Sequence, residues 1–183
     1  RHKSSAERHH DAGFLHWTKS ETLFEEIERQ NQLLLSAVGD GIYGVDANGC
    51  TTFVNPAAEV MLGWSKSELV GRNIHDMIHH THEDGSHYHP SDCPIYAAFH
   101  DGSVHSVDDE VFWSKSGKPI PVEYTSTPVT DNGNLVGAVV IFRDITERKV
   151  TEEKLLIAMR EVDSLKQRLE LENAYLQEEI KAD

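Results

Sequence analysis

Cysteine is scarce in this chain, which holds only Cys50 and Cys93 among its 183 residues. Two cysteines cannot build the disulfide framework of a small secreted domain, so we expect a reducing, cytoplasmic setting. The sequence also lacks a Cys-x-x-Cys pair and a Cys-x-x-Cys-His motif. These absences exclude a cysteine-only zinc array and covalently attached c-type haem.

Long apolar runs and basic charge are lacking as well. The sequence has neither an apolar run of about 18 residues nor a signal-peptide pattern, so no membrane span is expected in this segment. Lys and Arg number 17 against 31 Asp and Glu, which gives a net charge of −14. Because phosphate binding requires a clustered basic surface, no direct contact with nucleic acid is expected.

Signatures of catalysis are missing too. The sequence contains no Gly-rich phosphate loop and no nucleophile elbow. We therefore expect these residues not to be an enzyme. A chain that starts with Arg1 and stops in a helical pattern is expected to be a piece of a longer protein, whose effector domain lies outside this sequence.

A β-hairpin followed by a capped helix is predicted in the first half of the chain. Two β-rich segments, 42–45 and 51–54, flank an Asn-Gly pair, and these two residue types accept the backbone conformation of a tight turn. Asn55 then suits the N-cap of a helix, and Pro56 suits its first position. The predicted order is strand, turn, strand and helix.

The order of the motifs resembles a PAS sensory domain over roughly residues 32–149. The opening half is carried by Val45-Asp46-Ala-Asn-Gly49, Phe53-Val-Asn-Pro-Ala-Ala58, Leu62-Gly-Trp64 and Glu68-Leu-Val-Gly71. The closing half is carried by Val111–Gly117, Pro121–Pro128, Gly137–Phe142 and the Asp144-Ile-Thr146 junction. The resemblance implies an α+β PAS fold, in which a five-stranded antiparallel sheet carries short helices on one face around a ligand-sized cavity. It implies no particular reaction.

The chain divides into four predicted parts. Residues 1–17 are polar and predict a flexible arm, and residues 18–40 predict an amphipathic N-terminal cap helix that packs on the sheet or on a second subunit. Residues 41–146 form the predicted PAS domain. Residues 147–183 predict a coiled-coil signalling helix, and both helical segments are expected to join a homodimer.

The coiled-coil prediction comes from a seven-residue repeat of apolar residues. Its first seam position is taken by Leu155, Val162, Leu169 and Leu176, and its second by Ala158 and Leu165 before Glu172 and Glu179 weaken it. Such a seam is typical of a parallel dimer, and its uneven quality fits either a frayed end or a helix that shifts register. Asn173–Ile180 resembles the linker before the ATPase domain of enhancer-dependent transcription activators, but histidine kinases and diguanylate cyclases use similar helices.

Histidine is unusually concentrated in one part of the chain. Eight of the twelve histidines lie between positions 75 and 105: His75, His79, His80, His82, His87, His89, His100 and His105. Together with Cys93 they allow a metal or haem site, a solvated loop, or a cluster that responds to pH, and the sequence leaves these three open.

Within the metal hypothesis we expect zinc or iron to be bound by His79, His82 and Cys93, which spacing could bring to one cleft. Within the haem hypothesis the axial ligand would be Cys93 or His100, because oxygen-sensing PAS kinases use a His on the corresponding helix. Neither residue matches that pattern cleanly. The acidic run Asp108-Asp-Glu110 predicts the solvated beginning of a strand rather than acid/base chemistry.

The function that these observations favour is a sensory and dimerisation PAS module that relays a bound ligand to an effector through a coiled coil. The alternative is a constitutive dimerisation scaffold that binds no cofactor.

Overall fold

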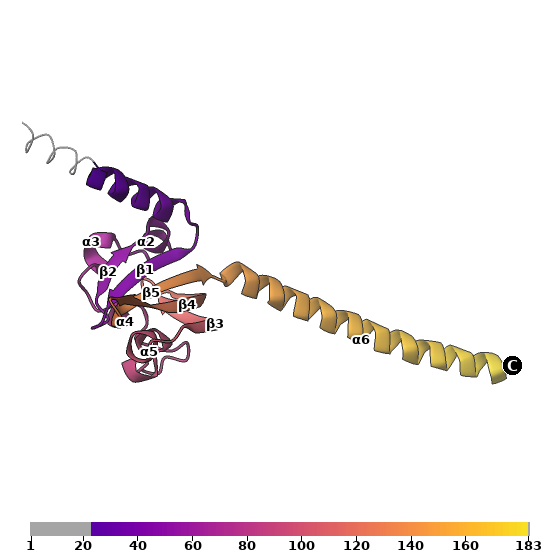
Figure 1. The fold of residues 1–183 in the computed structure, drawn as a ribbon. Coiled ribbons are helices and arrows are strands. Elements are labelled where there is room, and N and C mark those ends of the chain that lie inside the picture. The colour runs from indigo at the N-terminus through magenta and orange to yellow at the C-terminus, as the bar shows by residue number, and fades with distance from the viewer. Residues whose placement is uncertain (1–22, 183) are drawn as a thin grey trace, which may run out of the picture.

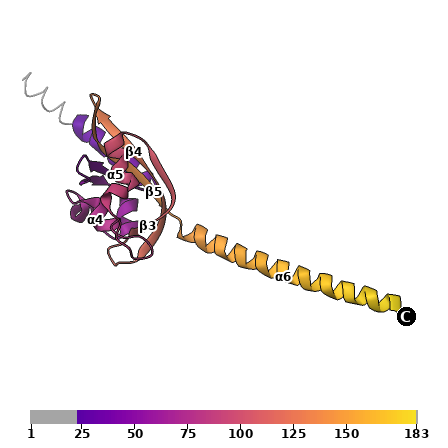
Figure 2. The same ribbon diagram turned by 90° about the horizontal axis from the view of Figure 1, so that it is seen from below.

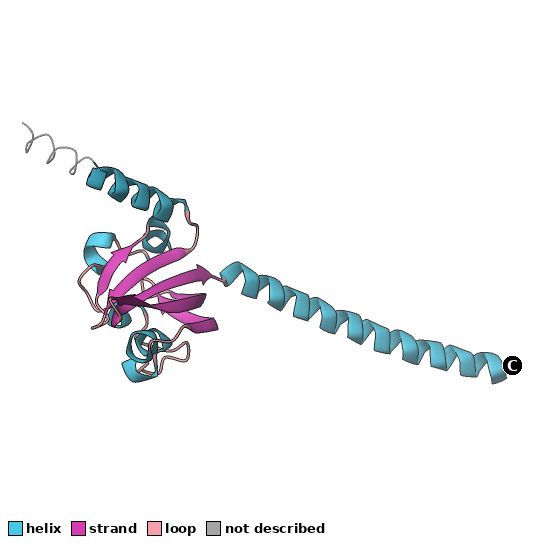
Figure 3. Ribbon diagram, viewed as in Figure 1, coloured by secondary structure: helices cyan, strands magenta, loops and turns pink. Residues whose placement is uncertain are grey.

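The computed structural model describes residues 23–182, with side chains up to Glu178. A five-stranded antiparallel sheet forms its centre, in the order β2-β1-β5-β4-β3 (Figures 1 and 3). Its strands are β1 (Gly41–Asp46), β2 (Thr51–Val54), β3 (His105–Trp113), β4 (Pro119–Asp131) and β5 (Asn134–Asp144). The predicted α+β PAS fold is confirmed. The flexible arm predicted for residues 1–17 lies outside the described residues.

Short helices cover one face of the sheet (Figure 2). They are α2 (Pro56–Leu62), α3 (Lys66–Leu69), α4 (Ile74–Ile78), the 3-10 turn η1 (Pro90–Asp92) and α5 (Pro94–Asp101). Side chains on alternate positions of the long strand β4 are buried, as expected for a sheet with one covered face. The core between the layers contains the fully buried Tyr43, Phe112 and Phe142.

Asn55 joins the hairpin, the first helix and the N-terminal segment. As the predicted N-cap of α2, it accepts a hydrogen bond from the backbone N–H of Ala58 (2.9 Å) and another from that of Ile42 (2.8 Å). Its amide nitrogen donates to the carbonyl oxygens of Leu35 (3.2 Å) and Asp40 (2.9 Å). The side chain is only 1% exposed. One residue therefore satisfies four backbone groups at the point where the chain enters the domain.

The centre of the sheet depends on a close approach between β1 and β5. Gly137 lies opposite Asp46 in the register of the two strands. A Cβ atom at this position would lie 1.9 Å from the carbonyl oxygen of Val45. Only glycine fits this contact without a backbone shift.

Two helices extend from the domain. Residues 23–37 form an N-terminal helix that stands off the sheet, and α6 (Thr146–Ala182) projects away from it (Figure 1). Arg143 at the end of β5 makes paired hydrogen bonds of 2.9 Å to Asp40, which follows the first helix. Among residues 23–182, no helix combines the length and the apolar character needed to cross a bilayer.

Candidate functional site

Three potential metal ligands meet in the core between the helices and the sheet. His75 and His79 lie four residues apart, so α4 and its C-terminal residue place them on the same inward face. Cys93 is the N-cap of α5, where the chain returns from the loop. The three residues are 2%, 1% and 1% exposed.

The three side chains are close enough to share one ion. The Sγ atom of Cys93 lies 3.2 Å from Nδ1 of His79. One ligand atom from each of His75, His79 and Cys93 lies within 4.8 Å of the other two. A Zn²⁺ ion with bonds of about 2.0 to 2.3 Å to nitrogen and sulfur would draw the most widely separated of these atoms together by about 1 Å.

The second ring nitrogen of each histidine faces an oxygen. Nε2 of His75 hydrogen-bonds to the carbonyl oxygen of Tyr88 at 2.8 Å. Nε2 of His79 lies 3.2 Å from Oε1 of Glu110, at ion-pair distance but without the direction of a good hydrogen bond. The other oxygen of Glu110 accepts a hydrogen bond of 2.6 Å from the Tyr124 hydroxyl. Glu110 is thus held between a tyrosine and a histidine.

Three buried polar atoms in this region have no well-directed hydrogen-bond partner among the described residues. They are Nδ1 of His75, Nε2 of His79 and the hydroxyl of Tyr43, whose residues are 2%, 1% and 0% exposed. A buried polar group without a partner costs about 1 to 3 kcal/mol, so each one calls for a structural reason. Burial raises the pKa of Tyr43, and Cys93 and Glu110 raise it further.

The charge states follow from burial and from the neighbours. Burial alone would raise the pKa of Glu110, but the adjacent His79 and the hydroxyls of Tyr124 and Tyr88 outweigh it and hold the pKa below its usual value, so the carboxylate is ionised at neutral pH. Burial lowers the pKa of His75, which is therefore neutral. Burial raises the pKa of the Cys93 thiol to about 11, against a smaller opposite effect from the backbone amides of Tyr96 and Ile95.

A hollow on the surface lies next to this group. It has a volume of about 560 Å³, and its lining includes Tyr88 and Glu110, which also contact the buried histidines. Four carboxylate residues line it: Glu83, Asp84, Asp109 and Glu110. A cation would therefore find negative charge between solvent and the buried ligands.

The structure brings together two of the three residues predicted as metal ligands. His79 and Cys93 are adjacent, but His82 is exposed on the loop and stacks on Tyr88, with ring centroids 3.9 Å apart. His75, rather than His82, completes the buried group with His79 and Cys93. The spacing of His75 and His79 was the signal that could have identified this pair, because residues four apart on a helix share a face.

The two alternative axial ligands predicted for haem lie in different surroundings. Cys93 is buried at the beginning of α5, whereas His100 is exposed in its last turn and contacts the edge of Phe99 at 5.0 Å between ring centroids. Aromatic side chains fill the core beside Cys93: Phe112 packs against Tyr124 and Phe142 with centroid distances of 5.4 and 5.3 Å. A porphyrin could enter only by displacing these rings, so the residues present do not fit haem.

The acidic run 108–110 differs from its prediction in two ways: it lies in the middle of β3 rather than at the beginning of a strand, and one of its three residues is not solvated. Asp108 and Asp109 are exposed, as expected, but Glu110 turns inward and its side chain is only 16% exposed. The pairing of β3 with β4 shifts register between Val107 and Glu110, so this strand does not simply alternate between its two faces. Sequence alternation alone could not reveal that shift.

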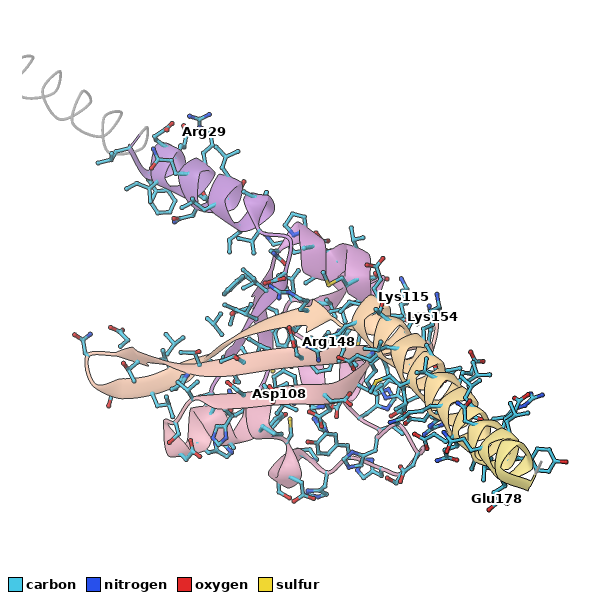
Figure 4. All side chains as sticks on the ribbon, turned by 90° about the vertical axis from the view of Figure 1, so that its right-hand side faces the viewer. Arg29, Asp108, Lys115, Arg148, Lys154 and Glu178 are labelled. Carbon is cyan, nitrogen blue, oxygen red and sulfur yellow. The ribbon has the colours of Figure 1, made fainter. Side chains whose placement is uncertain are left out.

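This irregular part of β3 also contacts the beginning of α6. Arg148 donates to the carbonyl oxygen of Asp108 at 3.1 Å, and the two residues lie side by side in Figure 4. Nζ of Lys149 lies 2.6 Å from Oδ1 of Asp109. Glu110 therefore faces the buried histidines from the same short segment that contacts α6.

Comparisons with known proteins agree with the fold. A family model described as the PAS fold matches residues 29–145. The chain is 33% identical over 132 residues to the "Probable diguanylate cyclase DgcE" of Escherichia coli K12, covering 71% of this chain and 11% of that protein. It is 30% identical over 136 residues to the "Signal transduction histidine-protein kinase AtoS" of the same organism, covering 74% of this chain and 21% of that protein.

The chain thus spans about a tenth to a fifth of the length of these relatives. Among solved structures, the PAS domain of a Colwellia psychrerythraea protein matches with a TM-score of 0.54 at 24% identity, covering 66% of this chain and 98% of that one. A PAS domain from Haloarcula marismortui matches with a TM-score of 0.55 at 21% identity, covering 70% and 99%. At these identities the structural matches establish the fold alone.

Proposed function

The chain belongs to the PAS family, and on that premise we propose that it senses a ligand in its core and relays this state through α6 to an effector domain outside the sequence. The observation that carries the proposal is the connection of α6 to the sheet. Its first turn contacts the part of β3 that holds Glu110 against His79. A change at the buried group therefore has a short physical route to the helix.

The junction between sheet and helix is tightly held. Oδ1 of Asp144 accepts hydrogen bonds from the backbone N–H of Thr146 (2.8 Å) and from its hydroxyl (2.5 Å). Ile145 between them is 2% exposed, and its backbone N–H donates to the carbonyl oxygen of Pro121 at 2.9 Å. A junction fixed on both sides supports transmission of strand movement to the helix.

Dimerisation through the two helical arms is part of the proposal. Leu155, Val162 and Leu169 of the seam are 60%, 64% and 59% exposed in the single chain. The N-terminal helix likewise exposes its apolar side chains, with Phe24 at 69% and Leu34 at 69%, so it does not bury them on its own sheet. Two apolar stripes that the single chain leaves in water favour burial against a second copy.

The relatives guide the choice of effector. One is named as a probable diguanylate cyclase and the other as a histidine kinase. We therefore favour one of these two effector classes over the ATPase of a transcription activator. In either case the catalytic residues would follow α6 in the full protein.

A chimera tests the relay. The chain would replace the matching segment of AtoS, and autophosphorylation would be measured with Phe112→Leu in the core, Asp144→Ala at the junction, and both together. A relay predicts that Phe112→Leu alters kinase output and that Asp144→Ala removes this effect. A constitutive scaffold predicts equal output from all dimeric variants. Asp131→Ala at the β4–β5 turn is the matched control and should leave the Phe112→Leu effect intact.

A further inference from the structure

We propose that His75, His79 and Cys93 bind a divalent transition-metal cation of the Zn²⁺ class, with water as the fourth ligand. Two imidazoles and one thiolate are a donor set that Zn²⁺ accepts in tetrahedral sites. The three residues are almost completely buried, and their ligand atoms lie within 4.8 Å of one another. The proposal deepens the sensory role proposed above by naming its ligand.

The contacts of the histidines assign one ligand atom to each. A histidine that binds a metal usually donates its other ring N–H to a carbonyl or carboxylate oxygen. His75 makes that contact through Nε2 to the carbonyl oxygen of Tyr88, and Nε2 of His79 lies 3.2 Å from Oε1 of Glu110, close enough for the same kind of contact. Nδ1 is then the free atom of both rings. For His79 this atom is the one that faces the sulfur of Cys93.

A purely structural cluster explains less of this arrangement. Hydrogen bonding between Cys93 and His79, and pairing of His79 with Glu110, would account for those two residues without a metal. It would leave Nδ1 of His75 buried and without a partner among the described residues. A metal ion at the centre of the group gives that atom a partner and removes the cost of burying it.

Charge balance also favours a divalent cation. The Glu110 carboxylate lies 3.2 Å from Nε2 of His79, and a cysteine that binds a metal loses its proton. A divalent ion would neutralise the two negative charges of Glu110 and the Cys93 thiolate. Because an unbalanced charge is costly in the interior, the neutral set of ion, thiolate and carboxylate is the stable one.

The acidic hollow offers a route to the site. Tyr88 and Glu110 line the hollow on one side and contact the histidines on the other. His82 stands on this route, stacked on Tyr88. It is therefore placed to influence how fast an ion enters rather than to hold it, which makes it a useful control residue.

Co²⁺ is the probe for the test, because thiolate and Co²⁺ give a near-ultraviolet charge-transfer band and a tetrahedral site gives intense d–d bands. The chain, stripped with a chelator, would be titrated with Co²⁺ and then with Zn²⁺. We expect the bands to saturate at one Co²⁺ per chain and to vanish on addition of Zn²⁺. Cys50→Ser should keep the charge-transfer band and Cys93→Ser should lose it.

Further variants identify the nitrogen ligands and the residue that orients them. His75→Ala and His79→Ala should abolish tight Co²⁺ binding, whereas His82→Ala and His100→Ala should leave the affinity unchanged. Glu110→Gln should weaken binding by about 10- to 100-fold, the effect typical of a residue that orients a ligand. Circular dichroism would verify folding. The band of the Cys50→Ser chain assigns the sulfur to Cys93 even if a core variant fails to fold.

The outcomes separate this inference from the relay. Any of three results would overturn the metal site. They are absence of the charge-transfer band, binding well below one ion per chain, and an equal loss of Co²⁺ affinity in His82→Ala and His79→Ala. None of these results would affect the kinase chimera, which reads the connection of the core to α6. If Co²⁺ binding is intact but all chimera variants have the same kinase output, the relay would be overturned and the metal site would be unaffected.

Discussion

Charging the seam of α6 should separate the proposed dimer into single chains. The double variant Val162→Glu/Leu169→Glu places a carboxylate at two successive first positions of the seven-residue repeat. In the single chain these side chains are 64% and 59% exposed, so most of their surface is available for burial by a partner. In a parallel pair each new charge would also face its own copy.

The size of the effect follows from the exposed surface. Full burial of a Val or Leu side chain contributes about 1.5 to 3 kcal/mol, so burying the exposed part of these two contributes roughly 1 to 2 kcal/mol for each. With two side chains from each of two helices, the dimer would lose roughly 4 to 8 kcal/mol. Since about 1.4 kcal/mol is a factor of ten, the dissociation constant should rise by roughly 10³ to 10⁶.

Sedimentation equilibrium over a range of concentrations would measure this change. The matched control is Leu156→Glu/Leu171→Glu, which adds the same charge at positions outside the seam that are 49% and 74% exposed. The control should remain dimeric with a nearly unchanged dissociation constant. If the seam variant and the control dissociate equally, or if both remain dimers, the subunits do not meet along this stripe.

Three further predictions concern the stability of the domain. Asp144→Ala should remove the side-chain hydrogen bonds to Thr146, which would lower the free energy of unfolding by about 0.5 to 2 kcal/mol in urea titrations and increase hydrogen exchange in the first turn of α6. Asn55→Ala leaves four backbone groups without their hydrogen-bond partner and should lower the free energy of unfolding by about 2 to 4 kcal/mol. A decrease below about 1 kcal/mol would show that water replaces the Asn55 side chain at these groups. Gly137→Ala should lower the melting temperature strongly through its clash with Val45, and an unchanged melting temperature would contradict the close approach.

Most of the fold could be predicted from the sequence, because interactions between residues close in the chain determine its strands and helices. Asn55 and Pro56 marked the beginning of α2, because the side-chain oxygen of Asn caps a helix and Pro lacks only an N–H that would be unpaired there. The predicted β-rich segments 42–45 and 51–54 match β1 and β2 to within one residue at each end. These elements were predictable because alternation and turn residues act over a few positions.

The candidate site was less predictable, because it depends on contacts between distant segments. Glu110 faces inward only because β3 shifts its register beside β4, and no local sequence pattern predicts that shift. His82 has suitable spacing from His79, but the loop turns it outward, and His75 on the preceding helical turn joins the group. Sequence spacing restricts which residues can meet, whereas the return of the loop to Cys93 decides which of them do.

Hydrogen exchange with and without Zn²⁺ tests the central claim, that the buried group communicates with α6, most directly. The contacts predict that Zn²⁺ changes protection at His75–Cys93, at the irregular segment 108–110, and at the first-turn amides of α6 near Arg148 and Lys149. Exchange farther along α6, beyond these contacts, should change less. A response confined to residues 75–93, with the first turn of α6 unaltered, would contradict the account.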